Sequence, residues 1–336
     1  MARTTQENQK RRRRSRLLKG LLLGGAAVGL PALANVLIAR RNRRLAAPAW
    51  GRPRRYSSQF GEVAYQDLGS GSPIVLLHSF GPGHDSEEWR AVGERLAASH
   101  RVLAVDLLGW GRSEKPDATY DGELYIQLIS DFLEDVVGER AVVVAAGLSA
   151  AYAVQVAIDA PGSISTLGLV VPSGVDAEGD EPDLRDALVH WVLRTPIFGA
   201  AALNLYTSQT SIGLYLRREV LAAPERADAA RVDHLYRSSH QPGAHAALAA
   251  YLSGYSNHRI VDALGRLKQP LWLAWGRAAK SPPVETADLW LQRTPQAELE
   301  LFEGSGSLPH LEEPAAFAAG LDRYLARQTA AAVPNG

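Results

Sequence analysis

The chain contains no cysteine, which excludes disulfide bonds, cysteine-ligated metal sites and a cysteine nucleophile. It also lacks an excess of either charge, because Lys plus Arg and Asp plus Glu each total 36, so nothing in its overall charge favours nucleic acid as a partner. A dinucleotide fingerprint is missing too, since the pair Gly109 and Gly111 is too short to form one. We therefore expect no metal and no organic cofactor.

What the chain does contain is enough apolar sequence for a large core. It has 336 residues, of which 46% are hydrophobic and 21% charged, as in globular proteins. The length allows one large domain with an appendage. We expect a basic segment at 1–19, a transmembrane anchor at 20–39, a linker at 40–53, a core at 54–178 and 268–330, and a helical cap at 179–267.

The predicted anchor is an uncharged stretch between two basic ones. Residues 20–39 carry no charge, and twenty helical residues span about 30 Å, the thickness of a bilayer core. Two alternatives remain open. Arg13 and Arg14 with the small-x-small sequence at 32–34 would suit a cleaved signal peptide, and a basic amphipathic helix could lie on the membrane surface. Both flanks are basic, so the positive-inside rule does not orient the anchor.

From residue 62 onward, short apolar segments alternate with helical patterns. Near-continuous apolar runs predict parallel strands that are buried on both faces. These strands are expected at 62–68, 73–78, 101–107, 141–146, 167–171, 271–275 and 298–302. Helical spacing of apolar residues predicts helices at 86–98, 124–137 and 314–325. The sequence therefore predicts an α/β fold with helices on both faces of a mostly parallel twisted sheet.

Residues 141–161, AVVVAAGLSAAYAVQVAIDAP, have the layout of a nucleophile elbow: a buried strand, a tight turn at Gly147 and a helix rich in small residues. Three further segments carry recognisable motifs: HSFGPG at 78–83, DLLGWGRS at 106–113 and GSGSLPHLEEP at 304–314. Together these motifs resemble the α/β-hydrolase superfamily, in its capped, esterase- and epoxide-hydrolase-like branch. The resemblance covers residues 54–326 and implies the α/β-hydrolase fold with a helical cap insertion.

The resemblance also indicates which residues occupy the catalytic positions. Counting back from Pro161 places Gly147 where the family has its nucleophile. The acid position after Trp275-Gly276 contains Ala279, and the histidine position contains Ser307. All three side chains of the usual triad are thus substituted. In an alternative register Ser149 would be the nucleophile, and His310, which matches a second, non-catalytic histidine of the family, is the other weak candidate.

The oxyanion hole depends on backbone amides, so it can persist without the triad. By resemblance its donors are the amides of Phe80 and Leu148, with His78 and Ser79 in the same loop. Ser305 is expected at the rim of this site. For the other polar candidates we expect structural roles or none: Asp106 is expected to support a turn, and Asp176 and Glu178 are expected to be exposed to solvent. We expect His234, His240 and His245 to be surface or lid residues and not metal ligands, because their spacings differ from that of a helical metal-binding pair.

Three functions remain open. The first is a membrane-anchored hydrolase of a small or lipid-like apolar substrate with a non-standard site. The second is a non-catalytic binding module, built on the hydrolase fold, for a hydrophobic ligand or a protein partner. The third is an ordinary esterase whose triad lies in another register. Whether the chain is an enzyme is left open by its sequence.

Overall fold

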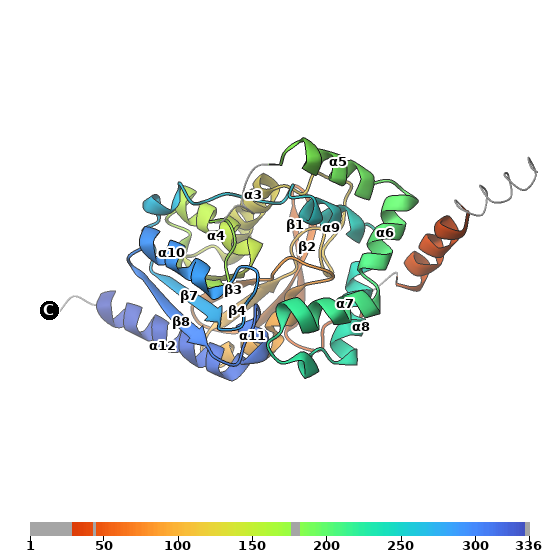
Figure 1. Cartoon of the computed structure of the whole chain (residues 1–336). Helices are drawn as coiled ribbons and strands as arrows, with labels where there is room; N and C mark the ends of the chain where they lie inside the picture. The colour runs from red at the N-terminus through yellow and green to blue at the C-terminus, as the bar shows by residue number, and fades with distance from the viewer. Residues whose placement is uncertain (1–28, 43–44, 176–181, 333–336) are drawn as a thin grey trace, which may run out of the picture.

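The computed structural model describes residues 29–42, 45–175 and 182–332. An eight-stranded sheet forms its centre (Figure 1). The strands are β1 (Arg52–Ser58), β2 (Gly61–Gly69), β3 (Pro73–Leu77), β4 (Arg101–Val105), β5 (Ala141–Ala146), β6 (Ile164–Val170), β7 (Leu271–Gly276) and β8 (Ala297–Phe302). Their order is β1-β2-β4-β3-β5-β6-β7-β8, with antiparallel pairing only at β1–β2 and β2–β4. The predicted mostly parallel sheet is confirmed.

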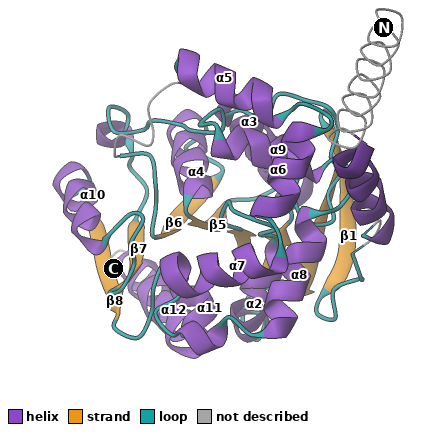
Figure 2. Ribbon diagram, turned by 45° about the vertical axis from the view of Figure 1, so that its right-hand side comes forward, coloured by secondary structure: helices purple, strands orange, loops and turns teal. Residues whose placement is uncertain are grey.

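Helices cover both faces of this sheet, which explains why its central strands are apolar throughout. Every residue of β3 and of β7 is buried. Helices α3 and α4 pack together on one face, and α2 packs against α12 on the other (Figure 2). The bounds of the helices around the sheet are α2 (Arg90–Leu96), α3 (Gly122–Phe132), α4 (Leu148–Asp159), α10 (Ala287–Arg293), α11 (Pro309–Glu312) and α12 (Pro314–Ala332).

Small side chains allow α4 to lie directly on the sheet. Ala150, Ala153 and Ala157, the small residues of the elbow sequence, are at most 1% exposed. Because a methyl group is all that separates the two backbones there, the helix can start directly at the end of β5. The close approach fixes the turn at Gly147 between a buried strand and a buried helix, and the candidate site is built on that turn.

Between β6 and β7 the chain forms a layer of helices beside the sheet (Figure 1). These are α5 (Leu184–Leu193), α6 (Phe198–Tyr206), α7 (Gln209–Tyr215), α8 (Ala229–Ser239) and α9 (Ala244–Leu252). They lie inside the segment expected to be the cap, 179–267, of which residues 179–181 are outside the described part of the chain. Two contacts bring this layer over the core: the Tyr251 ring lies 5.9 Å from that of Phe80, and the Ser307 amide donates to the Val220 carbonyl.

Strand β1 was not predicted, and it begins within the expected linker at 40–53. Its sequence, RPRRYSS, is polar and mostly exposed, so no hydrophobic alternation marks it. It forms because residue-by-residue pairing with β2, from Arg52 opposite Asp67 to Ser58 opposite Gly61, closes an antiparallel hairpin. Edge position explains why the strand tolerates so much charge.

The first described helix, residues 29–41, contains the second half of the predicted anchor. It is held against the cap, because the Asn35 side-chain amide donates to the Ile197 carbonyl at 3.1 Å and its oxygen accepts from Asn204 at 2.8 Å. None of the helices in the described residues is both long and apolar enough to cross a bilayer. The transmembrane anchor expected at 20–39 is therefore not supported, and residues 20–28 of it lie outside the described residues.

Candidate functional site

Gly147 forms the turn between β5 and α4, with φ of 58° and ψ of −123°. The tight turn expected at Gly147 is present, and its positive φ is a conformation that residues with a Cβ adopt only under strain. The turn is closed by the Gly147 amide donating to the Val170 carbonyl and by the Ser173 amide donating to the Gly147 carbonyl. A Cβ built on Gly147 would lie 3.6 Å from the Ser79 Cβ, an ordinary contact distance. The site thus has room for a side chain at this position but contains none.

Ser149 lies in the first turn of α4 and is fully buried. Its hydroxyl donates to the His78 carbonyl at 2.6 Å. His310 is also fully buried, stacked on Trp89 at 3.9 Å, and its Nε2 lies 3.3 Å from Glu88 Oε1. The structure therefore does not bring the two weak candidates together, and the hydroxyl of Ser149 is committed to the backbone.

The loops that carry Ala279 and Ser307 lie against each other. The Ala278 amide donates to the Ser305 carbonyl, and a Cβ on Gly276 would lie only 1.9 Å from the Gly306 carbonyl oxygen. The second of these loops is tied to the cap, because the Glu312 carboxylate accepts from the amides of Gly306, Ala222 and Ala223. Neither Ala279 nor Ser307 can supply the carboxylate or imidazole that a triad needs.

The oxyanion loop is ordered by side chains that face inward. His78 Nε2 accepts from the Leu107 amide at 3.1 Å, and its Nδ1 lies 2.7 Å from the Ser79 carbonyl oxygen. The Phe80 ring packs at 4.9 to 5.9 Å from four other rings, those of Trp110, Tyr125, Tyr152 and Tyr251. Within the described residues, no hydrogen bond uses the amide of Phe80 or of Leu148. Both predicted oxyanion donors are therefore available.

Beside this loop lies a buried polar cluster of Ser79, His84, Glu88 and His310, of which sequence reasoning missed His84 and Glu88. The Ser79 hydroxyl lies 2.8 Å from His84 Nδ1 and 2.9 Å from Glu88 Oε2, and the same Nδ1 lies 2.9 Å from that oxygen. The Glu88 carboxylate also accepts from the Ser79 amide at 2.8 Å. No local pattern in the sequence signals the contact between His84 and Glu88, because His84 lies in the loop before the 3-10 helix Ser86–Trp89 that carries Glu88.

The charge of Glu88 is stabilised inside the protein. Burial acts to raise the pKa of this carboxyl, but hydrogen bonds from His310 and His84 and their charges outweigh it and hold the pKa well below its usual range. His84 Nε2 and His310 Nδ1 are buried without a partner among the described residues. The cluster is thus a buried carboxylate with two imidazoles and one hydroxyl around it.

Next to the cluster is a pocket of about 380 Å³ between α2, α8 and α11, with both His84 and Glu88 in its wall. Across it, His234 of α8 contacts both oxygens of Asp85 at 2.9 and 3.0 Å. Burial acts to raise the pKa of Asp85, but the His234 charge and hydrogen bond lower it to about 2. Conversely, burial acts to lower the pKa of His234, and Asp85 raises it above its ordinary value. His234 is therefore a residue that ties the lid to the core.

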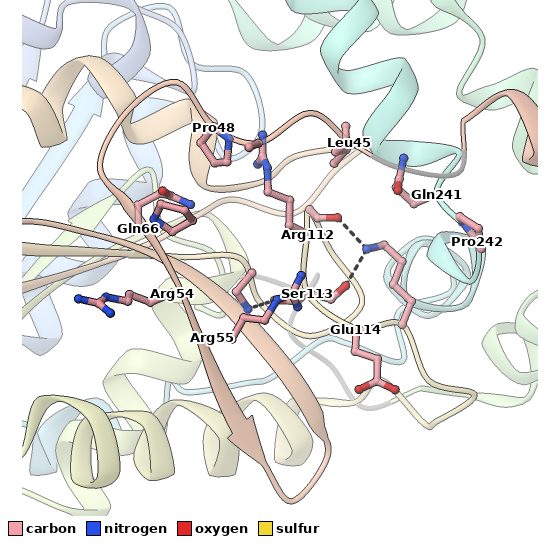
Figure 3. Close-up of a pocket in the computed structure, with 15 residues that line it drawn as sticks. Leu45, Pro48, Arg54, Arg55, Gln66, Arg112, Ser113, Glu114, Gln241 and Pro242 are labelled. Atoms are coloured by element: carbon pink, nitrogen blue, oxygen red, sulfur yellow. Dashed lines mark hydrogen bonds between the residues drawn. The ribbon is translucent and has the colours of Figure 1, made fainter.

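A larger hollow of about 810 Å³ lies away from the elbow, beside β1 and the turn after β4 (Figure 3). Arg54, Arg55, Arg112 and Lys115 give it a basic lining. The Lys115 ammonium is used structurally, because it donates to the carbonyls of Gly111 and Ser113 at 2.7 and 2.8 Å, and burial lowers its pKa to about 8. The hollow contains none of the predicted site residues.

The remaining polar candidates have structural partners. Asp106 accepts from the amides of Ser86 and Arg112, which is the turn-supporting role predicted for it. The Ser305 hydroxyl donates to Glu313 at 2.6 Å. His240 lies 2.6 Å from the Tyr236 carbonyl oxygen, and burial lowers the pKa of His245 to about 4. Asp176 and Glu178 lie outside the described residues.

Comparison with known proteins places this geometry in context. The model of a family described as the alpha/beta hydrolase family matches residues 74–320. The chain is 28% identical over 276 residues to the 2-hydroxymuconate semialdehyde hydrolase of Pseudomonas sp. (strain CF600), covering 80% of this chain and 91% of that protein. Two solved structures share the fold. A serine hydrolase of carbazole degradation (CarC) has a TM-score of 0.68 and 21% identity, covering 82% of this chain and 98% of the other. A membrane phospholipase A has a TM-score of 0.66 and 20% identity, covering 94% and 98%.

Proposed function

This chain belongs to the alpha/beta hydrolase family, and from that premise we propose that it binds an apolar ligand through a carbonyl or carboxylate oxygen, without forming a covalent intermediate at the elbow. The observation that carries this proposal is Gly147. Its backbone has the strained turn that presents a nucleophile, and it is half-buried, so solvent reaches it, yet it has no side chain that could attack. Binding without covalent chemistry is what remains.

Two features support binding of an oxygen atom at this turn. The amides of Phe80 and Leu148 have no hydrogen-bond partner among the described residues, and amides in such positions stabilise negative charge on an oxygen. Gly147 is also the N-cap of α4, and the N-terminus of a helix attracts anions. Both features depend on the backbone alone, so they are compatible with loss of the triad.

The apolar character of the ligand is proposed from the surroundings of Phe80. Its aromatic neighbours come from the core and, through Tyr251, from the cap. Such rings favour an apolar ligand body with a single polar group to orient it. The hydrolase from Pseudomonas is named for a semialdehyde, a molecule whose carbonyl oxygen is the kind of acceptor to which the two amides would donate.

The test has two steps: to probe the protein for an activated serine, and then to introduce one by substitution. We expect the full-length protein to resist labelling by a fluorophosphonate probe. We expect the triple variant Gly147→Ser, Ala279→Asp, Ser307→His to gain labelling, because it would supply a nucleophile, an acid and a histidine at the positions that the resemblance assigns to them. Gly147→Ser alone is the matched control and should stay unlabelled, since no base is added. Labelling of the unaltered protein would contradict the proposal.

Ester hydrolysis by Ser79 is the second candidate, and a specific observation favours it. The Ser79 hydroxyl contacts His84 Nδ1 and Glu88 Oε2, and its Cβ lies beside the position where an elbow nucleophile would begin. In that reaction the Ser79 oxygen would attack the ester carbonyl and its proton would pass to His84. An acyl-enzyme and an alcohol would form, and water would then release the acid.

The geometry ranks this reaction second. In the serine triad the imidazole contacts the carboxylate through one ring nitrogen and the nucleophile through the other. Here both contacts fall on Nδ1 of His84, while Nε2 has no partner in the described residues. Labelling that is lost in Ser79→Ala and kept in Ser149→Ala would favour the second candidate over the first. Attachment to a membrane through residues 20–39 stays a prediction.

A further inference from the structure

Large apolar side chains that face solvent are concentrated on three neighbouring helices. Among the described residues, all exposed large apolar side chains except Leu214 and Leu289 belong to the first helix (residues 29–41), α5 or α6. The set is Leu30, Leu33, Val36, Leu37, Leu184, Leu188, Val189, Trp191, Val192, Phe198, Leu205 and Tyr206. We call these residues the apolar face. Contiguous apolar surfaces of this kind mark contacts with a membrane or a protein.

The first helix shows the reverse of the polarity expected for a helix on a water-exposed surface. Asn35 in its middle is half-buried against the protein, and Asn42 directly after it is buried, whereas the charged Arg40 and Arg41 at its end are exposed. Its leucines face outward, with Leu33 and Leu37 both 56% exposed. A surface helix normally turns its apolar stripe inward. The outward side of this helix is therefore apolar and suited to contact with an apolar partner.

The outward stripes of α5 and α6 continue the same face. Leu184, Leu188 and Trp191 follow one another at spacings of four and three, so they lie on one side of α5, and Leu184 is 90% exposed. The Asn35 side chain forms two hydrogen bonds to this part of the cap, one with the carbonyl of Ile197, directly before α6, and one with the side chain of Asn204 in α6. These bonds place the first helix along α6, as Figure 1 shows. Since α5 also packs against α6, both the first helix and α5 are neighbours of α6.

Basic residues lie at the edge of the apolar face. Arg40 and Arg41 end the first helix and are exposed, and the sequence continues with Arg43 and Arg44. Residues 10–19, which precede that helix in the sequence and lie outside the described residues, include seven Lys or Arg and no acid. Positive charge beside an apolar face matches the anionic surface of a bilayer. It disfavours a second copy of this chain, which would bring the same charges together.

We propose that the apolar face is a membrane-docking surface, on which the first helix, α5 and α6 lie in the headgroup region of an anionic bilayer. The cap itself then contacts lipid, and attachment does not depend on residues 1–28 alone. The proposal is independent of whether the elbow binds a ligand or catalyses a reaction, since none of its residues belongs to that site.

Trp191 provides a built-in probe for the test. It is 67% exposed, whereas the other six tryptophans are each at most 4% exposed. The full-length protein would be mixed with vesicles of phosphatidylglycerol and phosphatidylcholine in equal parts, with and without brominated acyl chains. We expect brominated lipid to quench part of the tryptophan emission of the unaltered protein. We expect no such quenching in Trp191→Phe, although that variant should still sediment with the vesicles.

Two further variants decide whether the face itself binds. Leu188→Glu combined with Leu205→Glu should reduce binding to these vesicles roughly tenfold or more, because it places two charges in the apolar boundary of the bilayer. Leu289→Glu, a comparable exposed leucine on α10, is the matched control and should leave binding unchanged. All three positions are exposed, so folding should be preserved.

Three results would overturn the proposal. Unchanged vesicle binding of the double variant would assign attachment to residues outside the face. Equal binding to pure phosphatidylcholine would remove the role given to the basic edge. Protection of Trp191 from acrylamide in the absence of vesicles, together with sedimentation as a dimer that the double variant loses, would show that a second copy covers the face.

Discussion

Gly147→Ala tests the backbone conformation of the elbow, because it introduces a strain that glycine avoids. The new Cβ would lie 3.6 Å from Ser79 Cβ and 3.9 Å from Ser79 Cα, so no steric clash is expected. The cost comes instead from holding an L-residue at φ of 58° and ψ of −123°. Such a conformation costs about 1–3 kcal/mol. Loss of chain entropy in the unfolded state returns about 0.4–1 kcal/mol. We expect a net destabilisation of about 1–2 kcal/mol.

The measurement is urea unfolding followed by tryptophan fluorescence. With a slope of about 3 kcal/mol/M, the expected loss lowers the midpoint by roughly 0.3–0.7 M. Gly162→Ala is the matched control, because no atom lies within 4 Å of its added Cβ and its φ is not in the left-handed region. It should leave the midpoint unchanged or slightly higher. Gly276→Ala should be far worse than either, since its Cβ would meet the Gly306 carbonyl oxygen at 1.9 Å.

Two results would refute this reasoning. A Gly147→Ala protein as stable as the Gly162→Ala control would mean that the turn does not have a positive φ. A loss as large as that of Gly276→Ala would mean that the space above the turn is filled. Either result would also undermine the proposed oxyanion site, which requires both the turn and the space.

Three other substitutions have expected outcomes. Ser149→Ala should cost about 1 kcal/mol, because it removes the hydrogen bond to the His78 carbonyl, and should leave any activity within a few-fold; urea unfolding and an ester assay check this. Glu88→Ala should cost about 3–5 kcal/mol near neutral pH, because it leaves its buried partners without their acceptor. Since the pKa of Glu88 is lowered in the folded protein, that difference should be complete above about pH 5 and shrink as the pH falls, which midpoints from pH 7 to pH 3 would show. His234→Gln removes the contact with Asp85. Because the pKa of His234 is raised in the folded protein, the stabilisation from this contact is complete below about pH 6.5 and is lost as the pH rises above that value, so the urea midpoints of variant and parent should converge with rising pH.

Much of the fold followed from local pattern. The Val-rich segment before Gly147 and the alanines after it specify a buried strand and a closely packed helix, because a strand covered on both faces has to be apolar throughout. The observed strands agree with the predicted ones within a few residues, as β7 (Leu271–Gly276) shows against a prediction of 271–275. Strand β1 was missed because it is held by pairing with β2 and not by an apolar face of its own.

For the site, the sequence by itself indicated which side chains are absent from the motif positions. Gly147, Ala279 and Ser307 cannot act as nucleophile, acid and base whatever the tertiary structure, because side-chain chemistry is a property of the residue. The tight turn at Gly147 was also predicted, and a glycine tolerates the positive φ that the structure shows there. That these positions correspond to a triad remains a prediction from the resemblance.

Only the tertiary structure decided what surrounds those positions. Ser79, Glu88 and His310 are up to 231 residues apart in the chain, yet the folded protein brings them into one buried cluster. Contacts of this kind depend on how loops from separate strands meet, and no local pattern encodes them. The apolar face has the same origin. The leucines of residues 30–37 read as half of a membrane span, and only the bonds from Asn35 to α6 show that they extend a surface of the cap.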